Sequence, residues 1–245
     1  IFFKGFPHVN FAFIFSFPED MGREGGIFPS IVGTIQLALL SILLATPLGL
    51  GTAIFLTEYT KESLFTKFIR FGVESLAGIP SILYGLFGFI FFVIKLKMGW
   101  SLLAGVLTMT IMILPTIISI SFDALVSVPR TYREGSAAMG ATKWQTIYKV
   151  IIPSAKSGIL ASFILGMGRA IGETMAVIMI AGNALKIPTS ILDPLRTLTG
   201  NIALELAYAT GDHRLGLFST GVVLMVIIMI LNYVANFGIK RKIAK

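Results

Sequence analysis

The stretch IVGTIQLALLSILLATPLGLGTAIFL, residues 31–56, contains no charged side chain, and it decides how the chain must fold. A helix needs about 20 mostly apolar residues to cross the roughly 30 Å hydrocarbon core of a bilayer. Four other stretches meet the same requirement. We therefore predict an all-α fold, a polytopic bundle of transmembrane helices. The expected spans, with boundaries soft by several residues, are 31–56, 71–94, 101–124, 158–181 and 216–237.

The composition supports a membrane protein and excludes other classes. The 245 residues are 55% hydrophobic and 13% charged, whereas an ordinary soluble domain is about 25% charged. No Cys is present, and the two histidines, His8 and His213, lie outside the expected spans. We therefore expect no disulfide framework, no metal site and no cofactor. The net charge of +8 comes mainly from short loops, so membrane orientation explains it better than nucleic-acid binding.

The distribution of basic residues predicts the orientation. Segments 57–70, 125–157 and 238–245 carry twelve Lys and Arg, and the other loops and the N-terminal segment carry seven over a greater length. The denser side is expected to face the cytoplasm, which puts the C-terminus inside and the 183–215 loop outside. The chain begins without Met, and we expect residues 1–6 to be the tail of an apolar span whose start is missing. That helix would give six spans.

The segment 129–157, PRTYREGSAAMGATKWQTIYKVIIPSAKS, is too polar to span a membrane. Its pattern predicts a helix from Pro129 with Glu134 early, an interruption at Gly140, and a second helix from Ala141 that Pro153 ends. The second helix is expected to present one apolar face, made of Trp144, Ile147, Tyr148 and Ile151. Periodicity leaves two interpretations open: a docking module for another protein, or a helix lying on anionic lipid.

The same segment resembles the EAA loop of ABC importer permeases. The family pattern is E-A-A, three residues, Gly, nine residues, then I-x-L-P. Here it runs from Glu134-Gly135-Ser136 through Gly140 to Val150-Ile151-Ile152-Pro153. The two Ala of the family are replaced by Gly and Ser. The resemblance implies that this loop inserts into a groove of an ATPase subunit. The coupling residues that it implies are Glu134, Gly140, Ala141, Trp144 and Pro153.

Further stretches resemble the permeases of bacterial and archaeal phosphate importers, from about residue 25 to the end of the chain. The front half looks more like one permease subunit of that system, PstA, and the later motifs look more like the other, PstC, so the subunit stays open. Molybdate and sulfate permeases share the loop and the span count, so another oxyanion also stays open. The stretches are GGIFPSIVGT (25–34), PLGLGTAIFLTEY (47–59), SLAGIPSILYGLFG (75–88), RAIGETMAV (169–177) and LDPLRTLTGNIALE (192–205).

Arg169 is the only basic residue in the five expected spans, and Glu173 follows four residues later. A charge at the bilayer centre costs about 2.5–3.5 kcal/mol on insertion scales, so a function is expected to offset it. Arg binds oxyanions bidentately and stays protonated. If the helix is continuous, Glu173 lies on the same face and can pair with Arg169. The pair either serves an anion path or neutralises itself and locks two helices together; Ser81 and Tyr84 are weaker path candidates.

Gly168 and Gly172, which flank Arg169, form a GxxxG pattern that permits close helix contact.

No P-loop, HExxH or Ser/His/Asp set is evident, so we do not expect an enzyme. A secondary transporter or channel, the other alternative, would be expected to carry internal repeats, and none is detected. The resemblance implies one permease domain over 1–245 in the cell membrane of a bacterium or archaeon. It also implies four kinds of partner: a second permease subunit in a homo- or heterodimer, two ATP-binding subunits, an extracytoplasmic phosphate-binding protein and lipid. The outer loop 183–215 holds an Asp193-Pro194 turn and an apolar stretch, 202–208, that is expected to form an interfacial or re-entrant helix.

Overall fold

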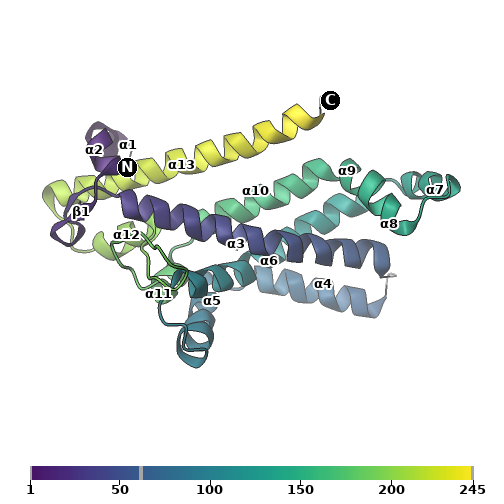
Figure 1. Cartoon of the computed structure of the whole chain (residues 1–245), viewed down its shortest axis with the longest axis horizontal. Helices are drawn as coiled ribbons and strands as arrows, with labels where there is room; N and C mark the ends of the chain where they lie inside the picture. The colour runs from purple at the N-terminus through teal and green to yellow at the C-terminus, as the bar shows by residue number, and fades with distance from the viewer. Residues whose placement is uncertain (1, 61–62, 244–245) are drawn as a thin grey trace. The chain divides into compact units, whose positions relative to one another are not determined.

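The computed structural model describes residues 2–60 and 63–243, apart from the side chains of Met21 and residues 234–243. The chain is mostly helical, with one two-stranded antiparallel hairpin, β1 with β2 (Figure 1). In chain order the elements are α1 Phe2–Gly5, η1 Phe6–His8, α2 Phe11–Phe15, β1 Pro18–Glu19, η2 Asp20–Gly22, β2 Glu24–Gly25, α3 Phe28–Ile54, η3 Phe55–Tyr59, α4 Leu64–Ala77, α5 Ser81–Gly88, η4 Phe89–Lys95, α6 Leu102–Val126, α7 Arg130–Ala138, α8 Lys143–Thr146, η5 Ile147–Ile151, α9 Ile152–Ser154, α10 Lys156–Gly172, α11 Met175–Ile180, α12 Leu198–Glu205 and α13 Gly211–Ile243.

Three helices in the described part of the chain are long and apolar enough to cross a membrane by themselves. They are α3 continued by the π-helical η3 to Tyr59, then α6, and α13 from Gly211 to Tyr233. They confirm the spans expected at 31–56, 101–124 and 216–237, the last as far as the described side chains reach. Five basic residues behind the expected orientation lie outside the described side chains: Lys61, Lys240, Arg241, Lys242 and Lys245.

The span expected at 71–94 is wrong as one continuous helix. The chain forms α4 and then a separate helix, α5, which continues into η4. Pro80 stands between the two with extended backbone, at ψ 136°. Proline lacks the amide hydrogen that a helix interior needs, and it disfavours helical backbone at the residue before it.

The span expected at 158–181 is also wrong in its bounds. Helix α10 ends at Gly172, and the next helix, α11, begins only at Met175. The helical run Lys143–Ser154 meets α10 at a bend of 70°. Counting each broken pair, α4 with α5–η4 and this run with α10, as one span gives up to five spans.

The chain divides into two compact units. Unit 1 comprises Ile1–Ser41, Pro80–Thr110 and Gly168–Val234. Its α11 packs along α5 and contacts α12 (Figure 1). Close approach is possible because Gly85 has no side chain: a Cβ there would lie 2.7 Å from the Cα of Ala176. Small residues at contacts matter in a bilayer, where lipid tails remove the hydrophobic driving force between helices and packing must replace it.

Unit 2 contains Ile42–Ile79 and Ile111–Met167. Its core joins η3, α6 and η5, with Leu56, Leu125 and Ile147 among the buried side chains. Gly158 of α10 lies against Ala124 of α6, where a Cβ would clash.

Gly168 and Gly172 differ from Gly158, because a Cβ on either would meet nothing within 4 Å. The close contact expected from their GxxxG pattern is therefore not made with any described residue of this chain.

Candidate functional site

Arg169 lies half-buried in the last turn of α10. The carbonyls at a helix C-terminus lack intrahelical donors and carry partial negative charge, so a cation is favoured there. The helix ends at Gly172, Glu173 and Thr174 are not helical, and Met175 begins α11. Within membranes, such breaks are tolerated where the backbone is buried in protein or lines a polar cavity. Arg169, the one basic residue within the expected spans, therefore lies beside a helix break.

Glu173 occupies the break itself. Its Oε1 accepts a hydrogen bond from the backbone N–H of Ala176 at 3.1 Å, and its carbonyl accepts one from Thr199 Oγ1 at 2.7 Å. The expectation that Glu173 shares a helix face with Arg169 is wrong, because the helix ends at Gly172 and the carboxylate turns to the first turn of α11. The structure thus removes the helical geometry on which the expected pairing depended.

Tyr84 of α5 is buried, with 5% of its surface exposed, and it lies within electrostatic range of Arg169. Ser81 is half-buried at the start of the same helix, three residues earlier and hence on the same face. Since α5 packs on α11, unit 1 brings Tyr84, Arg169 and the break at Glu173 into one region. The role of these residues in a path stays a prediction.

A second charged group in unit 1 is absent from the sequence-based site. Arg196 donates from Nη1 to Glu205 Oε1 at 2.9 Å and to Asn201 Oδ1 at 3.1 Å, and from Nε to the Asn183 carbonyl at 3.0 Å. The side chains of Arg196 and Glu205 are only 13% and 10% exposed. Both charges are visible in the sequence, Arg196 just before α12 and Glu205 at its last position, but no pattern indicated that they meet.

Helix α12 lies earlier than the apolar stretch 202–208 suggested. The Thr197 side chain accepts a hydrogen bond from the Gly200 N–H at 3.1 Å and so starts the helix at Leu198. The helix is buried along Leu198–Asn201 and at Glu205, so it packs within unit 1, and its interfacial or re-entrant placement stays a prediction.

The turn expected at Asp193-Pro194 lies slightly earlier, over residues 190–193, and the Asp193 carboxylate holds it. Asp193 Oδ2 accepts from the N–H groups of Ser190 and Thr189, at 3.0 and 2.9 Å, and from the Thr189 hydroxyl at 3.0 Å. Lys186 Nζ lies 3.3 Å from Oδ1. These donors, the Ser190 N–H foremost, lower the pKa of Asp193 to about 2.

The segment 129–157 forms two short helices that meet near Gly140, as expected, and they lie together in unit 2 (Figure 1). Gly140 follows α7 with φ +76°, a conformation that side chains other than Gly rarely adopt. The second helix begins at Lys143, two residues later than predicted, because Thr142 and Gln145 form a capping box. It continues to Ser154, one residue beyond Pro153.

The single apolar face expected on the second helix is wrong. Ile147 and Ile151 are fully buried in the core of unit 2, whereas Trp144 and Tyr148 are each 64% exposed. Residues at these spacings form a stripe that covers about 100° of the helix circumference. Only the edge of the stripe that carries Ile147 and Ile151 packs against the core. The segment from Ile147 to Ile151 is also π-helical, which underwinds the helix and turns Ile151 further from Tyr148. Two aromatic side chains are therefore left on the surface.

Glu134 is exposed on α7, and Ser136 joins α7 to α8 through a hydrogen bond of 2.8 Å to the Thr146 hydroxyl. A Cβ at Gly135 would meet nothing within 4 Å, so the Ala of the EAA pattern would fit there. Ala141 is half-buried and Pro153 is exposed. The segment thus keeps Glu134 accessible while its two helices are tied together.

Arg133 was not singled out in the sequence, yet it makes the strongest polar contacts of this segment. Nη2 donates to Glu58 Oε1 at 2.7 Å and to the Leu125 carbonyl at 3.0 Å, Nε donates to Oε1 at 3.2 Å, and Nη1 donates to the Val128 carbonyl at 2.7 Å. The Glu58 side chain is 7% exposed and that of Arg133 is 26% exposed. One guanidinium therefore ties α7 to the ends of α3–η3 and α6.

Comparison with known proteins gives the family. The family described as "Binding-protein-dependent transport system inner membrane component" matches residues 45–244. The chain is 40% identical to the "Probable ABC transporter permease protein YqgH" of Bacillus subtilis, covering 92% of this chain and 76% of that protein. It is 36% identical to the "Phosphate transport system permease protein PstC" of Mesorhizobium japonicum, covering 95% of this chain and 80% of that protein.

A solved structure supports the same fold. A chain from the structure described as "Inward facing conformations of the MetNI methionine ABC transporter" aligns with a TM-score of 0.73 at 16% identity, covering 88% of this chain and 95% of that chain. This likeness shows the architecture of an ABC importer permease and nothing about cargo. The chain belongs to the family of binding-protein-dependent transport system inner membrane components, and it is a membrane-spanning permease subunit of an ABC importer.

Proposed function

We propose that this permease carries phosphate. The observation that carries the proposal is the position of Arg169, a half-buried cation beside the helix break of α10 and α11 and within electrostatic range of Tyr84. Support comes from relatives named as PstC phosphate permeases, which are 36% and 33% identical over 95% of the chain. That extent includes the front half, so the relatives also favour the PstC position in a heterodimer.

The chemistry of the site suits an oxyanion. Phosphate carries about −1.5 charges at neutral pH, and desolvating it is costly unless cations or aligned donors replace the water. Arg169 supplies a planar fork of donors, and the hydroxyls of Tyr84 and Ser81 supply further hydrogen bonds. In this proposal Glu173 is the counter-charge that keeps the anion from binding so tightly that it cannot leave.

The segment 129–157 is the proposed contact with an ATP-binding subunit, through Glu134, Gly140, Ala141, Trp144 and Pro153. The exposed aromatic rings of Trp144 and Tyr148 suit a partner groove. Arg133 and Glu58 would pass a movement of α7 to the ends of α3 and α6. The complete importer would hold a second permease, two ATP-binding subunits and an extracytoplasmic phosphate-binding protein, with the C-terminus of this chain in the cytoplasm.

The cargo is tested by uptake into vesicles that contain the assembled importer and its binding protein. We expect ATP-dependent uptake of labelled phosphate, with tenfold excesses of sulfate or molybdate lowering it by less than about twofold. A site that selects by charge and hydrogen-bond pattern separates a protonated phosphate from fully ionised sulfate. Uptake of labelled sulfate or molybdate in preference to phosphate would assign the alternative oxyanion.

The coupling contact is tested at Gly140. A Val there must adopt φ +76° or distort the turn between α7 and α8, at a cost of order 1–3 kcal/mol. We expect Gly140→Val to lower phosphate transported per ATP hydrolysed by about tenfold or more, while Gly135→Ala, which meets no neighbour, keeps the wild-type ratio. An unchanged ratio in Gly140→Val would remove the docking assignment.

A further inference from the structure

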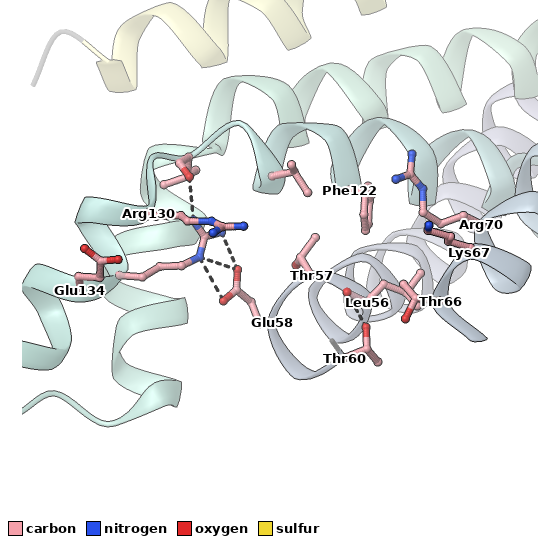
Figure 2. Close-up of a pocket in the computed structure, with 13 residues that line it drawn as sticks. Leu56, Thr57, Glu58, Thr60, Thr66, Lys67, Arg70, Phe122, Arg130 and Glu134 are labelled. Atoms are coloured by element: carbon pink, nitrogen blue, oxygen red, sulfur yellow. Dashed lines mark hydrogen bonds and ion pairs between the residues drawn. The ribbon is translucent and has the colours of Figure 1, made fainter. Parts of the chain in front are cut away.

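Unit 2 contains a cavity of about 470 Å³ whose basic residues Lys67, Arg70 and Arg130 have no part in the transport proposal. It lies between η3, the first turns of α4, the end of α6 and the first turns of α7. Figure 2 shows Lys67 and Arg70 at one end of the cavity, Arg130 and Glu134 at the other, and Phe122 between them. Its volume lies in the range of about 300–1,000 Å³ that is usual for small-ligand sites.

The charges around this cavity favour an anion. Its lining has four basic residues, Lys67, Arg70, Arg130 and Arg133, and two acidic ones, Glu58 and Glu134. Arg133 and Glu58 satisfy one another at 2.7 Å and form a rigid wall. Apart from that pair, the lining has three cations, Lys67, Arg70 and Arg130, and one carboxylate, Glu134.

The three remaining cations are available for a ligand. None of the ion pairs between described residues involves Lys67 or Arg130. Arg70 has Glu74 at 3.7 Å, but both side chains are largely exposed and such a pair is weak. The Arg70 guanidinium lies 4.3 Å from the centroid of the Phe122 ring, which holds it over the cavity.

Two threonine hydroxyls in the lining are already used as donors within their own helix. Thr57 Oγ1 donates to the Ala53 carbonyl at 2.9 Å, and Thr60 Oγ1 donates to the Leu56 carbonyl at 2.6 Å. Both hydroxyl hydrogens are therefore used within the helix. A ligand would meet guanidinium and ammonium donors at the ends of the cavity and apolar side chains between them, Leu56, Phe122, Val126 and Val128.

We propose that this cavity binds a phosphate group, as an anionic phospholipid headgroup or as inorganic phosphate. Guanidinium forks and ammonium groups match phosphate oxygens in charge and geometry. The apolar walls would take the part of a lipid next to its headgroup. The other face of α4 suits lipid too, because Leu64, Phe65, Phe68 and Phe71 are exposed there. The inference is independent of which cargo the permease carries.

The test compares three versions of the purified, assembled importer without nucleotide. They are the wild type, the cavity double variant Lys67→Gln/Arg130→Gln, and the control double variant Lys95→Gln/Lys97→Gln. The side chains of all four residues are exposed, and the two control lysines do not line the cavity. One arm counts phosphatidylglycerol and phosphatidylcholine molecules retained per complex by native mass spectrometry after delipidation and re-addition. The other arm measures equilibrium binding of labelled inorganic phosphate.

We expect the cavity variant to retain at least about tenfold less phosphatidylglycerol than wild type and control, with phosphatidylcholine unchanged. Loss of an inorganic phosphate site in the cavity variant alone would support the proposal with free phosphate as the ligand. Equal phosphatidylglycerol retention and equal phosphate binding in all three proteins would overturn it. If the double variant does not assemble, Arg130→Gln against Lys97→Gln repeats the same comparison.

Discussion

Two arginines, Arg133 in unit 2 and Arg169 in unit 1, show two uses of a buried or half-buried charge. Arg133 stands in the continuous helix α7, and its donors reach one nearly buried carboxylate and two carbonyls at the end of α6. Arg169 stands at the end of α10, beside a break whose carboxylate, Glu173, accepts from the next helix. The first arrangement fixes a junction, and the second places a half-buried charge beside an interrupted backbone.

Under the transport proposal these two charges have different tasks. A charge with protein partners in a fixed geometry is costly to remove because its partners stay behind unsatisfied. A charge that serves a moving anion must instead release its ligand in every cycle. We therefore expect changes at Arg133 to lower stability first and changes at Arg169 to lower uptake first.

The largest effect on stability is expected for Arg133→Gln. It leaves the nearly buried Glu58 carboxylate and two carbonyls without their donors, so we expect a loss of about 3 kcal/mol, the lower end for a broken buried pair. Thermal unfolding of the purified permease in detergent measures it. Arg70→Gln, which removes a weak exposed ion pair and a cation–π contact with Phe122, is the control and should cost about 1 kcal/mol. Equal losses of stability in the two variants would contradict the structural role assigned to Arg133.

A smaller effect on stability is expected from substituting the glycines near the two ends of α10, Gly158 and Gly168. Gly158→Ala places a methyl group against Ala124, and such overpacking costs about 1–3 kcal/mol. Gly168→Ala meets nothing within 4 Å, and it should leave stability unchanged or raise it by up to about 1 kcal/mol, because Ala favours a helix over Gly. The same unfolding measurement compares them. A destabilising Gly168→Ala would contradict the packing described for unit 1.

The smallest effect is expected from Asp193, through pH. Its pKa falls from an ordinary 3.8 to about 2 in the folded chain. A carboxyl whose pKa is lowered by folding stabilises the fold above its ordinary pKa, and that contribution is lost as the pH falls through the folded pKa. We expect Asp193→Asn to remove part of the loss of stability between about pH 4 and about pH 2. Identical pH profiles for wild type and variant would show that the turn is held by other contacts.

The long uncharged helices and the turn at Gly140 were predictable because each depends on local sequence. Uniform apolarity over more than about 20 residues has few other solutions, and a Gly between two short helical patterns usually ends the first. The break at Pro80 also had a signal in the sequence. The break at Glu173 did not, because apolar residues continue on both sides and hydropathy alone reads them as one span.

Other parts of the site depend on contacts between distant residues. Glu58 and Arg133 are 75 positions apart, and no periodicity indicates that they meet. The apolar face expected at Trp144 is divided between core and surface. Which of its residues pack in the core depends on tertiary contacts and on a π-helical turn. Arg169 itself was found from composition alone, as the one basic residue within the expected spans, but its neighbours required the structure.

The most direct test of transport is phosphate uptake and ATP hydrolysis measured together in vesicles that contain the whole importer, with wild type, Arg169→Gln and Arg169→Lys. We expect Arg169→Gln to lower uptake by about a hundredfold, since the proposed site loses its charge-assisted hydrogen bonds to the anion, while the unfolding temperature shifts less than in Arg133→Gln. Arg169→Lys should recover part of the uptake by restoring the charge without the fork. Wild-type uptake with Arg169→Gln, or a loss of uptake matched by a loss of folding, would contradict the account.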